Sequence, residues 1–240
     1  MKLTDEQRTW FDSVRRQWFE RIAPNAGLHG AHVLDVPARL PQAAMSRARV
    51  FADRMAALPT LPANAVVAEI GTETGWFAEQ VLAALDPREL HLFDLEFDTL
   101  RGARPALADH PRVRLHQGDS PGELAKLPDR YFDWIYIDGD HTLEGVRRDA
   151  EVAVAKVKSD GILVFNDYTV WSILELTDYG VVPIVNELLA SGEWEMVHIA
   201  LHPLMYCDVA IRRARSPAGR IARYRRTLMD ILRARLRRPT

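Results

Sequence analysis

The sequence predicts an α/β fold in which a mostly parallel sheet is covered by helices on both faces. From residue 63 onward, short apolar runs alternate with longer segments of helical periodicity. The apolar runs are nearly continuous, which is typical of parallel strands buried on both faces. The last two runs, 194–201 and 206–213, are separated by too few residues for a crossover helix, so we expect them to pair antiparallel.

Strands and helices alternate before that antiparallel pair. The strands are expected at 65–71, 89–95, 112–118, 132–138 and 161–167. The helices are expected at 76–85, 98–108, 121–126, 143–156 and 181–191. Ligands of open parallel sheets bind at the carboxyl ends of the strands, so we look for functional residues there.

The N-terminal segment predicts helices rather than strands. Thr4 and Gln7 form a capping box for a helix expected at 4–23, and a second helix is expected at 41–57. The segment 58–62 contains two prolines and ends this region. We therefore expect an N-terminal helical extension (1–62), a sheet domain (63–213) and an arginine-rich, amphipathic C-terminal helix (214–240).

Two interpretations of the C-terminal helix stay open. Arginines interspersed with apolar residues at helical spacing are typical of helices that bind an anionic partner or a membrane surface. The same pattern also suits a solvated helix that packs on the body or on another subunit, and we favour this second interpretation.

Composition excludes several classes of protein. The formal net charge is −2, which argues against nucleic-acid or membrane binding by the body of the chain. No apolar stretch is long enough for a membrane span, and the polar N-terminus carries no secretory signal. Because Cys207 is the single cysteine, the chain forms no internal disulfide, and we expect a reducing, cytoplasmic setting.

Every predicted parallel strand ends next to a carboxylate. These acids are Glu69, Asp94, Asp119, Asp138 and Asp167. One acid at a strand end is most simply a helix cap or a solvated turn residue. Five acids at the same edge of a sheet predict a binding site.

The first strand leads into a turn with Gly71 and Gly75, where glycine lets the backbone approach a ligand closely. A dinucleotide site would place a glycine at Glu73, and this carboxylate would repel a pyrophosphate at the helix N-terminus. Asp94 follows Gly75 at the roughly 20-residue interval at which an acid meets ribose hydroxyls. Asp119 could accept a hydrogen bond from an adenine amino group. The loop therefore suits a nucleoside without phosphates.

Four segments together resemble the motifs of class I S-adenosylmethionine-dependent methyltransferases. They read "VVAEIGTETGWFA", "LHLFDLE", "QGDS" and "YIDGDHTLEGVRRDAEVAVAKVKSDGILVFNDY". The last segment is most similar to the branch of macrocin-type and cephamycin-type O-methyltransferases, which is often grouped with the catechol-type metal-dependent enzymes. The resemblance covers roughly residues 63–213 and implies a Rossmann-like sheet of seven strands with the last strand antiparallel.

The resemblance also implies roles for individual residues. The cofactor-binding set that it implies is Glu69, Gly71, Thr72, Gly75, Asp94, Asp119, Ser120 and Asp138. Glu69 would orient the glycine turn, Asp94 would hold the ribose, and Asp119 with Ser120 would flank the adenine.

Catechol-type relatives hold Mg²⁺ with an aspartate after the fourth strand and an Asp-Asn pair after the fifth. Asp138 matches the first position, and Asn166 with Asp167 occupies the second place in reversed order. Two carboxylates and an amide oxygen are ligands that suit Mg²⁺, which would lower the pKa of a substrate hydroxyl. The alternative is that Asp138 and Asp167 cap the helices that follow them.

His141 is the expected general base, in the region where catechol-type relatives carry a lysine. An imidazole can take a proton near neutral pH. Asp140 is a competing candidate, and His141 could instead orient Asp138 or cap the helix near Thr142. Tyr168, Trp171 and Tyr179 could shape an acceptor pocket, although ordinary packing is the simpler interpretation.

We therefore expect an S-adenosylmethionine-dependent methyltransferase that methylates a hydroxyl of a small molecule. Two alternatives stay open: a nicotinamide-dependent oxidoreductase, against which Glu73 argues, and an inactive methyltransferase fold that binds a partner through its arginine-rich tail. The N-terminal extension could cover the acceptor or contact a second subunit, so a homo-oligomer is also open.

Overall fold

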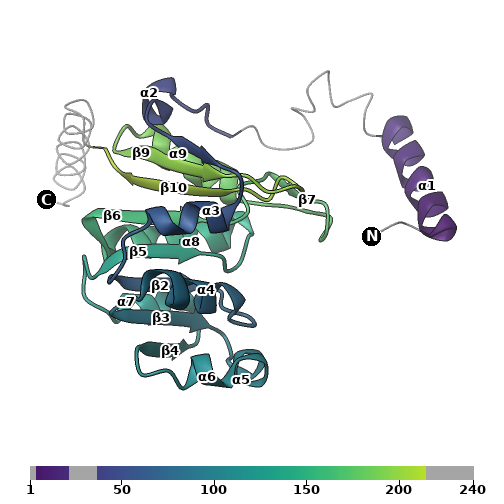
Figure 1. Cartoon of the computed structure of the whole chain (residues 1–240). Helices are drawn as coiled ribbons and strands as arrows, with labels where there is room; N and C mark the ends of the chain where they lie inside the picture. Colours follow the sequence, from purple (N-terminus) through teal and green to yellow (C-terminus); the bar gives the residue numbers. More distant parts are fainter. Residues whose placement is uncertain (1–3, 22–36, 215–240) are drawn as a thin grey trace, which may run out of the picture. The chain divides into compact units, whose positions relative to one another are not determined.

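The computed structural model describes residues 4–21 and 37–214 (Figure 1). The chain divides into two compact units at Pro37/Ala38. In the first unit, α1 (Asp5–Arg21) begins as the capping box predicts: the Thr4 amide donates to Gln7 Oε1 at 2.9 Å, and the Gln7 amide donates to Thr4 Oγ1 at 3.2 Å. The predicted C-terminal helix at 214–240 lies almost entirely outside the described residues.

The second unit is built on an eight-stranded sheet in the order β1-β9-β10-β6-β5-β2-β3-β4. Figure 1 shows these strands stacked in this order from β9 to β4. All neighbours are parallel except the two pairs that involve β10, as the sequence predicts. The strands are β1 (Arg49–Phe51), β2 (Val66–Ile70), β3 (Glu89–Asp94), β4 (Val113–Gln117), β5 (Phe132–Ile137), β6 (Val157–Phe165), β9 (Trp194–Ala200) and β10 (Asp208–Arg213).

Helices cover both faces of this sheet and complete two apolar cores. One core lies under α7 (Ser120–Ala125), α8 (Leu143–Lys156) and α9 (Val181–Ala190). The other lies under the 3₁₀ helix η2 (Leu58–Thr60), α4 (Trp76–Leu85), α5 (Asp98–Ala103) and α6 (Pro105–Ala108). Alternate residues of β2 face opposite cores, Val66 and Ala68 toward the first and Val67 toward the second. The strands are continuously apolar because both faces of the sheet are buried.

The eighth strand comes from a segment that the sequence assigns to the extension, and the predicted helix at 41–57 is wrong. Its first part, α2 (Gln42–Met45), ends after one turn. The chain then pairs as β1 with the edge of β9, where backbone groups would otherwise lack partners. Asp53 begins α3 (Arg54–Ala57) by accepting a 2.7 Å hydrogen bond from the Ala56 amide.

Two smaller differences concern the loops. The predicted helix at 98–108 is divided into α5 and α6 at Arg104, directly before Pro105. Proline removes an amide donor and restricts the residue before it, so a continuous helix is disfavoured. After β6 the chain forms a short hairpin, β7 (Trp171–Ser172) with β8 (Thr177–Asp178), which the sequence analysis did not predict.

The order of the strands places a crevice between β2 and β5. From β2 the chain proceeds to β3 and β4 on one side, and it returns to β5 and β6 on the other. The helices that follow these two strands diverge at this point, which is where open α/β sheets bind ligands. The Asp138 amide donates to the Ile70 carbonyl at 2.9 Å, so the two strand ends stay in register at the crevice.

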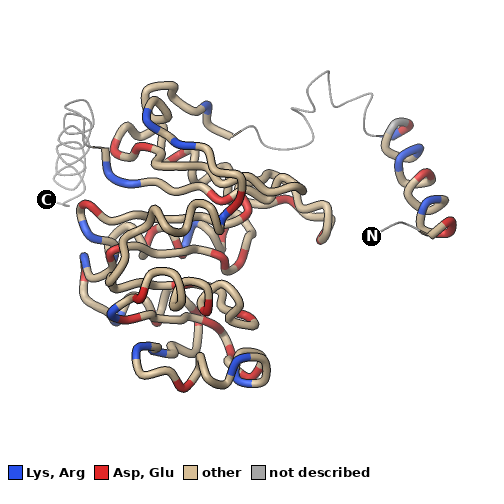
Figure 2. The backbone as a smooth tube through the Cα atoms, viewed as in Figure 1, with Lys and Arg blue, Asp and Glu red and all other residues tan. Residues whose placement is uncertain are grey.

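No helix in the described ranges is long and apolar enough to cross a membrane. Figure 2 shows basic and acidic positions interspersed along the coloured tube of the second unit. In that view the described residues form no continuous basic stripe, in agreement with the balanced net charge.

Candidate active site

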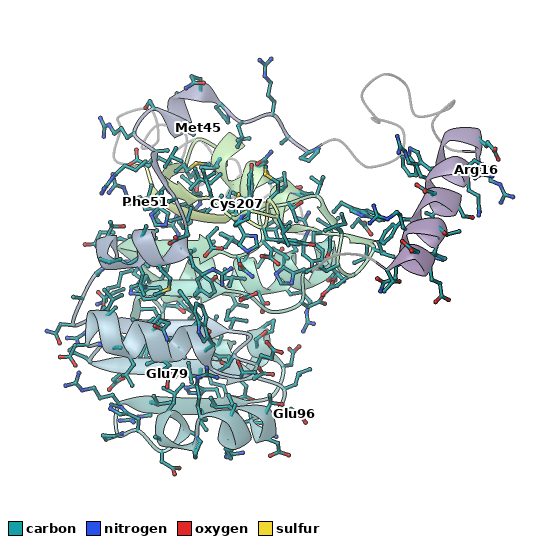
Figure 3. All side chains as sticks on the ribbon, turned by 45° about the vertical axis from the view of Figure 1, so that its right-hand side comes forward. Arg16, Met45, Phe51, Glu79, Glu96 and Cys207 are labelled. Carbon is teal, nitrogen blue, oxygen red and sulfur yellow. The ribbon has the colours of Figure 1, made fainter. Side chains whose placement is uncertain are left out.

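A cavity of about 780 Å³ opens at the carboxyl ends of β2, β3, β4 and β5. Its lining includes eight of the residues that the sequence singles out: Glu69, Gly71, Thr72, Asp94, Asp119, Ser120, Asp138 and His141. Glu96, labelled in Figure 3, also lines it, just past the end of β3. Gly75, Asn166 and Asp167 are not among the lining residues, although all three contact the loops that form it.

The turn after β2 requires its glycines. Gly71 has φ +81°, and a Cβ there would overlap the carbonyl of Asp138 on the neighbouring strand. Gly75 has φ +73° and is packed against Leu100, so it also has no room for a side chain. Both positions combine the left-handed region with close packing, which leaves glycine as the residue that fits. The loop is thereby held open toward the cavity.

Asp94 organises the same loop from the end of β3. Its Oδ2 accepts hydrogen bonds from the amides of Thr72 and Glu73 at 2.9 and 2.8 Å, and its Oδ1 accepts one from Leu95 at 2.7 Å. The carboxylate lines the cavity as well. Each carboxylate oxygen has more than one lone pair, so Asp94 can hold the loop and accept from ligand hydroxyls together.

The side of the cavity at β4 contains partners that the sequence analysis missed. Asp119 accepts a 2.7 Å hydrogen bond from Arg148, and Ser120 donates to Asp149 at 2.6 Å. Both partners come from α8 and line the cavity. Burial raises the pKa of Asp149 to about 6, although the Ser120 hydrogen bond acts in the opposite direction. The "RRD" of α8 offered no signal beyond its charge.

The cavity is lined by buried polar atoms that have no partner. Among the described residues, five buried side-chain nitrogen or oxygen atoms lack a hydrogen bond within the protein. Three of them, Glu69 Oε2, Thr72 Oγ1 and His141 Nε2, belong to residues that line this cavity. Buried polar groups are nearly always satisfied, so their concentration here indicates that a ligand supplies the missing partners. Burial also raises the pKa of Glu69 well above its usual value.

His141 lies between two carboxylates. Its Nε2 is 3.5 Å from Asp138 Oδ1 and 3.8 Å from Asp167 Oδ2. Its ring stacks on Tyr179 with centroids 4.6 Å apart, which fixes the plane of the imidazole. Burial lowers the pKa of His141 while Asp167 opposes that shift, so the neutral imidazole is favoured. A neutral imidazole is what a general base needs.

Asp140, the competing candidate for the base, is engaged in other hydrogen bonds, and a different side chain caps α8. Asp140 accepts from both the amide and the hydroxyl of Thr142, at 2.9 and 3.0 Å. Thr142 is itself the N-cap of α8, since its Oγ1 accepts from the Gly145 amide at 3.1 Å. Neither Asp138 nor His141 is therefore the side chain that caps this helix.

Asp138 is tied to the end of β6. Its Oδ1 accepts a 2.5 Å hydrogen bond from Asn166 Nδ2. Burial raises the pKa of Asp138 to about 8, although Asn166 and Arg54 act against this shift. The next residue, Asp167, has φ +52°, a left-handed conformation that is strained for a non-glycine residue.

Arg54 also reaches the cavity, from α3, and no pattern in the sequence predicts it. It donates to Asn166 Oδ1 at 2.7 Å and forms an ion pair with Asp208 at 3.3 Å. Its guanidinium lies 5.8 Å from the ring centroid of Phe77 and 6.0 Å from that of Tyr136. The residue lies 112 positions before Asn166 along the chain, and no local motif marks it.

The residues do not fit the magnesium site that the catechol-type resemblance implies. An arginine only donates hydrogen bonds, so the Asn166 atom that faces Arg54 must be the amide oxygen. That oxygen is the atom that a metal would need, and a guanidinium already lies against it.

Comparison with known proteins agrees with this geometry. Residues 68–168 match the model of a family described as a methyltransferase domain. A stretch of 101 residues is 33% identical to a Mycolicibacterium paratuberculosis protein named "Putative O-methyltransferase". That alignment covers 38% of this chain and 46% of the relative, so the match spans about half of the relative's length.

Solved structures share the fold at low identity. A Corynebacterium glutamicum structural-genomics target is 18% identical with a TM-score of 0.51, over 86% of this chain and 98% of that one. The pyocyanin biosynthetic protein PhzM is 19% identical with a TM-score of 0.50, over 63% and 51% of the two chains. These likenesses show the fold alone. Together with the matched family model, they identify residues 68–168 as similar to a methyltransferase domain.

Proposed function

We propose that this chain binds S-adenosylmethionine in the cavity at the ends of β2–β5 and transfers its methyl group to a hydroxyl of a small molecule. The observation that carries the proposal is the set of buried, unpartnered atoms on Glu69, Thr72 and His141, which face one cavity beside a glycine turn. The matched methyltransferase domain over residues 68–168 supports the same assignment.

The cavity suits a cationic nucleoside better than a phosphorylated one. Four acidic residues line it: Glu69, Glu73, Asp94 and Asp138. Their negative charge would repel a pyrophosphate. A positively charged ligand would favour the ionised forms of Asp138 and Glu69, which burial disfavours. Charge therefore supports a sulfonium cofactor over a nicotinamide dinucleotide.

The residues of the first three strand ends would hold this cofactor. Gly71 lets the turn pack directly against the Asp138 carbonyl at the edge of the cavity, and Thr72 Oγ1 is free to donate or accept. Asp94 would accept from a ribose hydroxyl through Oδ1, which among the described residues accepts only from the Leu95 amide and keeps a free lone pair. Asp119 and Ser120, each anchored to α8, would flank the base.

The chemistry asks the protein for position and for removal of one proton. The cofactor would supply an activated methyl group, and the electron pair of the broken carbon–sulfur bond would stay on sulfur. His141 Nε2 would take the hydroxyl proton of the acceptor as the new carbon–oxygen bond forms. The flanking carboxylates of Asp138 and Asp167 would stabilise the resulting imidazolium. Stacking on Tyr179 holds the ring while the acceptor binds.

Calorimetric titration with S-adenosylhomocysteine tests the cofactor assignment directly. We expect one-to-one binding that Asp94→Ala weakens by about tenfold or more, since ribose and loop contacts are lost together. Asp98→Asn is the matched control, because Asp98 lies on the exposed surface of α5 and outside the cavity lining. Absence of binding, or tighter binding of NADH, would contradict the proposal.

Acceptor chemistry is tested separately. Incubation with methyl-labelled S-adenosylmethionine and matched panels of phenols, sugars, carboxylic acids and amines should label the hydroxyl compounds. We propose oxygen as the target because a neutral imidazole is a suitable base for a hydroxyl proton. Labelling confined to amines, with no pH dependence attributable to His141, would contradict this part.

A further inference from the structure

We propose that the guanidinium of Arg54 occupies the place of the divalent metal in this site, so that the chain works without metal and Arg54 positions its acidic residues. The inference rests on the proposed function for its catalytic consequence, but its structural core, a fixed internal cation, does not. It concerns a residue that no motif of the sequence marks.

The hydrogen bonds of Asn166 fix the orientation of its amide. Arg54 donates to one atom of this amide at 2.7 Å, and Asp138 accepts from the other at 2.5 Å. Arginine has no acceptor, so the oxygen faces Arg54 and the NH₂ faces Asp138. An Asn166 in this orientation presents a donor toward Asp138, which is the opposite of what a shared metal requires.

Acidic groups surround Arg54 and favour its charged form. Burial disfavours its charged form, yet Tyr136, Asp208, Asp138 and Asp167 together raise its pKa. Two of these groups, Asp138 and Asp167, are the carboxylates that would ligate a metal. One positive charge already acts on both carboxylates, and a dication brought to the same place would be repelled by the guanidinium.

Contacts on several sides hold the Arg54 side chain in place. Its Nη2 lies 3.3 Å from Asp208 Oδ1, and Asp208 Oδ2 accepts from the Tyr136 hydroxyl at 2.9 Å. The guanidinium lies over the rings of Phe77 and Tyr136. Its side chain is 24% exposed, and Asp53 caps the short helix that carries it. A side chain held from so many directions acts as a fixed charge rather than as a mobile surface group.

The consequence is a chain of positioning contacts from α3 to the reacting groups. Arg54 orients Asn166, Asn166 holds Asp138, and Asp138 lies 3.5 Å from the Nε2 of His141. Arg54 is therefore a positioning residue for the base. Its removal should disturb catalysis while the binding loop for the cofactor, built from other strand ends, stays intact.

Manganese titration followed by electron paramagnetic resonance tests the substitution of metal by arginine. Mn²⁺ is the probe because it reports binding without turnover. We expect the signal of free Mn²⁺ to be unchanged by the wild-type protein, with and without S-adenosylhomocysteine. Activity should be the same in EDTA and in added Mg²⁺. Stoichiometric loss of the free signal, abolished by Asp167→Asn, would overturn the proposal.

Variants of Arg54 test the positioning role. Arg54→Met should lower kcat by about 100-fold, as expected for a misplaced base, with the affinity for S-adenosylhomocysteine within about threefold. Arg54→Lys keeps the positive charge but not the planar set of guanidinium donors, so its kcat should lie between those of Arg54→Met and the wild type. Arg49→Met is the control, because Arg49 lies on β1 over Phe51 and belongs to neither contact chain. Unchanged kcat in Arg54→Met would overturn the positioning role.

The readouts keep this inference separate from the proposed function. If S-adenosylhomocysteine does not bind, the function fails while the manganese result still decides whether Arg54 excludes a metal. If it binds and Mn²⁺ also binds, the function stands and this inference fails. Should Arg54→Met not fold, Arg54→Lys and the wild-type titration decide the question.

Discussion

The two halves of the cavity are built in different ways. What we call the cofactor half comprises Gly71, Thr72, Asp94, Asp119 and Ser120, which lie at or just after the ends of β2, β3 and β4. The acceptor half comprises Arg54, Asp138, His141, Asn166 and Asp167, and its central contact joins Arg54 to Asn166, 112 positions away.

This difference explains why the halves should respond differently to mutation. The cofactor half depends on backbone conformation, through glycines and amide hydrogen bonds, so small changes of the loop remove binding. The acceptor half depends on side chains that orient one another, so changes there should affect catalysis more than binding.

The largest effect is expected in the cofactor half. Gly71→Ala places a Cβ against the Asp138 carbonyl at a φ of +81°, so the loop must move or the strand ends must separate. We expect the affinity for S-adenosylhomocysteine to fall by more than about 100-fold and the Tm to decrease, measured by calorimetry and thermal melting.

Gly102→Ala is the matched control for this change. Gly102 lies in α5 with no atom within 4 Å of an added Cβ. Alanine favours a helix over glycine by about 0.5–1 kcal/mol, so the control should be neutral or slightly stabilising. Equal binding by both variants would show that the turn after β2 is not the cofactor site.

The next effect breaks the acceptor half. His141→Gln keeps a polar side chain but removes the base, so kcat should fall by about 10²–10⁴-fold. Binding of S-adenosylhomocysteine should change by less than about threefold, because the cofactor half is intact. The rate is measured in single-turnover methyl-transfer experiments. If the variant is as active as the wild type, His141 is not the base, and Asp138 becomes the candidate.

The pH dependence of stability should separate the halves. Burial raises the pKa of Asp149, beside the cofactor half, to about 6 and that of Asp138, in the acceptor half, to about 8. An unfolded aspartate ionises near pH 4. The folded protein therefore keeps protons that the unfolded chain has lost, and the free energy of unfolding falls as pH rises through each window.

Urea unfolding of the ligand-free protein between about pH 4 and pH 9 measures these windows. Asp149→Asn should flatten the dependence below about pH 6, and Asp138→Asn should also flatten it between about pH 6 and pH 8. Each change is at most about 1.4 kcal/mol per pH unit. A slope between pH 6 and 8 that is the same in the wild type and in Asp138→Asn would refute the assignment to this residue, since Glu69 contributes equally to both proteins.

The smallest effect concerns the support of Arg54. Asp53→Ala removes the cap of α3 and should lower the free energy of unfolding by about 1 kcal/mol. Because Arg54 is the first residue of this helix, kcat should decrease more than the affinity for S-adenosylhomocysteine. A loss of cofactor affinity alone would show that the two halves are coupled more tightly than their contacts indicate.

The sequence predicts where the residues of the cofactor half lie, because its signals are local. Continuous apolar runs identify the buried strands, and the acids and glycines stand directly after them. Gly71 and Asp94 belong to different strands, yet parallel strands must end at one edge, so their proximity follows from the predicted topology alone.

The acceptor half could be predicted only in part. His141 and Asp138 are close in sequence and lie together as expected, whereas Arg54 comes from a segment predicted to be a continuous helix. That segment instead adds β1 to the edge of β9, and this pairing is decided by contacts with a strand about 149 positions away. Helical propensity is weak compared with such tertiary pairing, so local patterns could not reveal it.

The backbone of Asp167 has a consequence for any attempt to engineer this chain. At φ +52° a glycine would relieve the local strain, by about 1 kcal/mol, at the cost of a carboxylate beside the base. Selection for thermal tolerance alone would thus tend to favour a sturdier protein with a poorer catalyst. Stabilising substitutions are better sought in the two apolar cores, where rigidity and turnover do not compete.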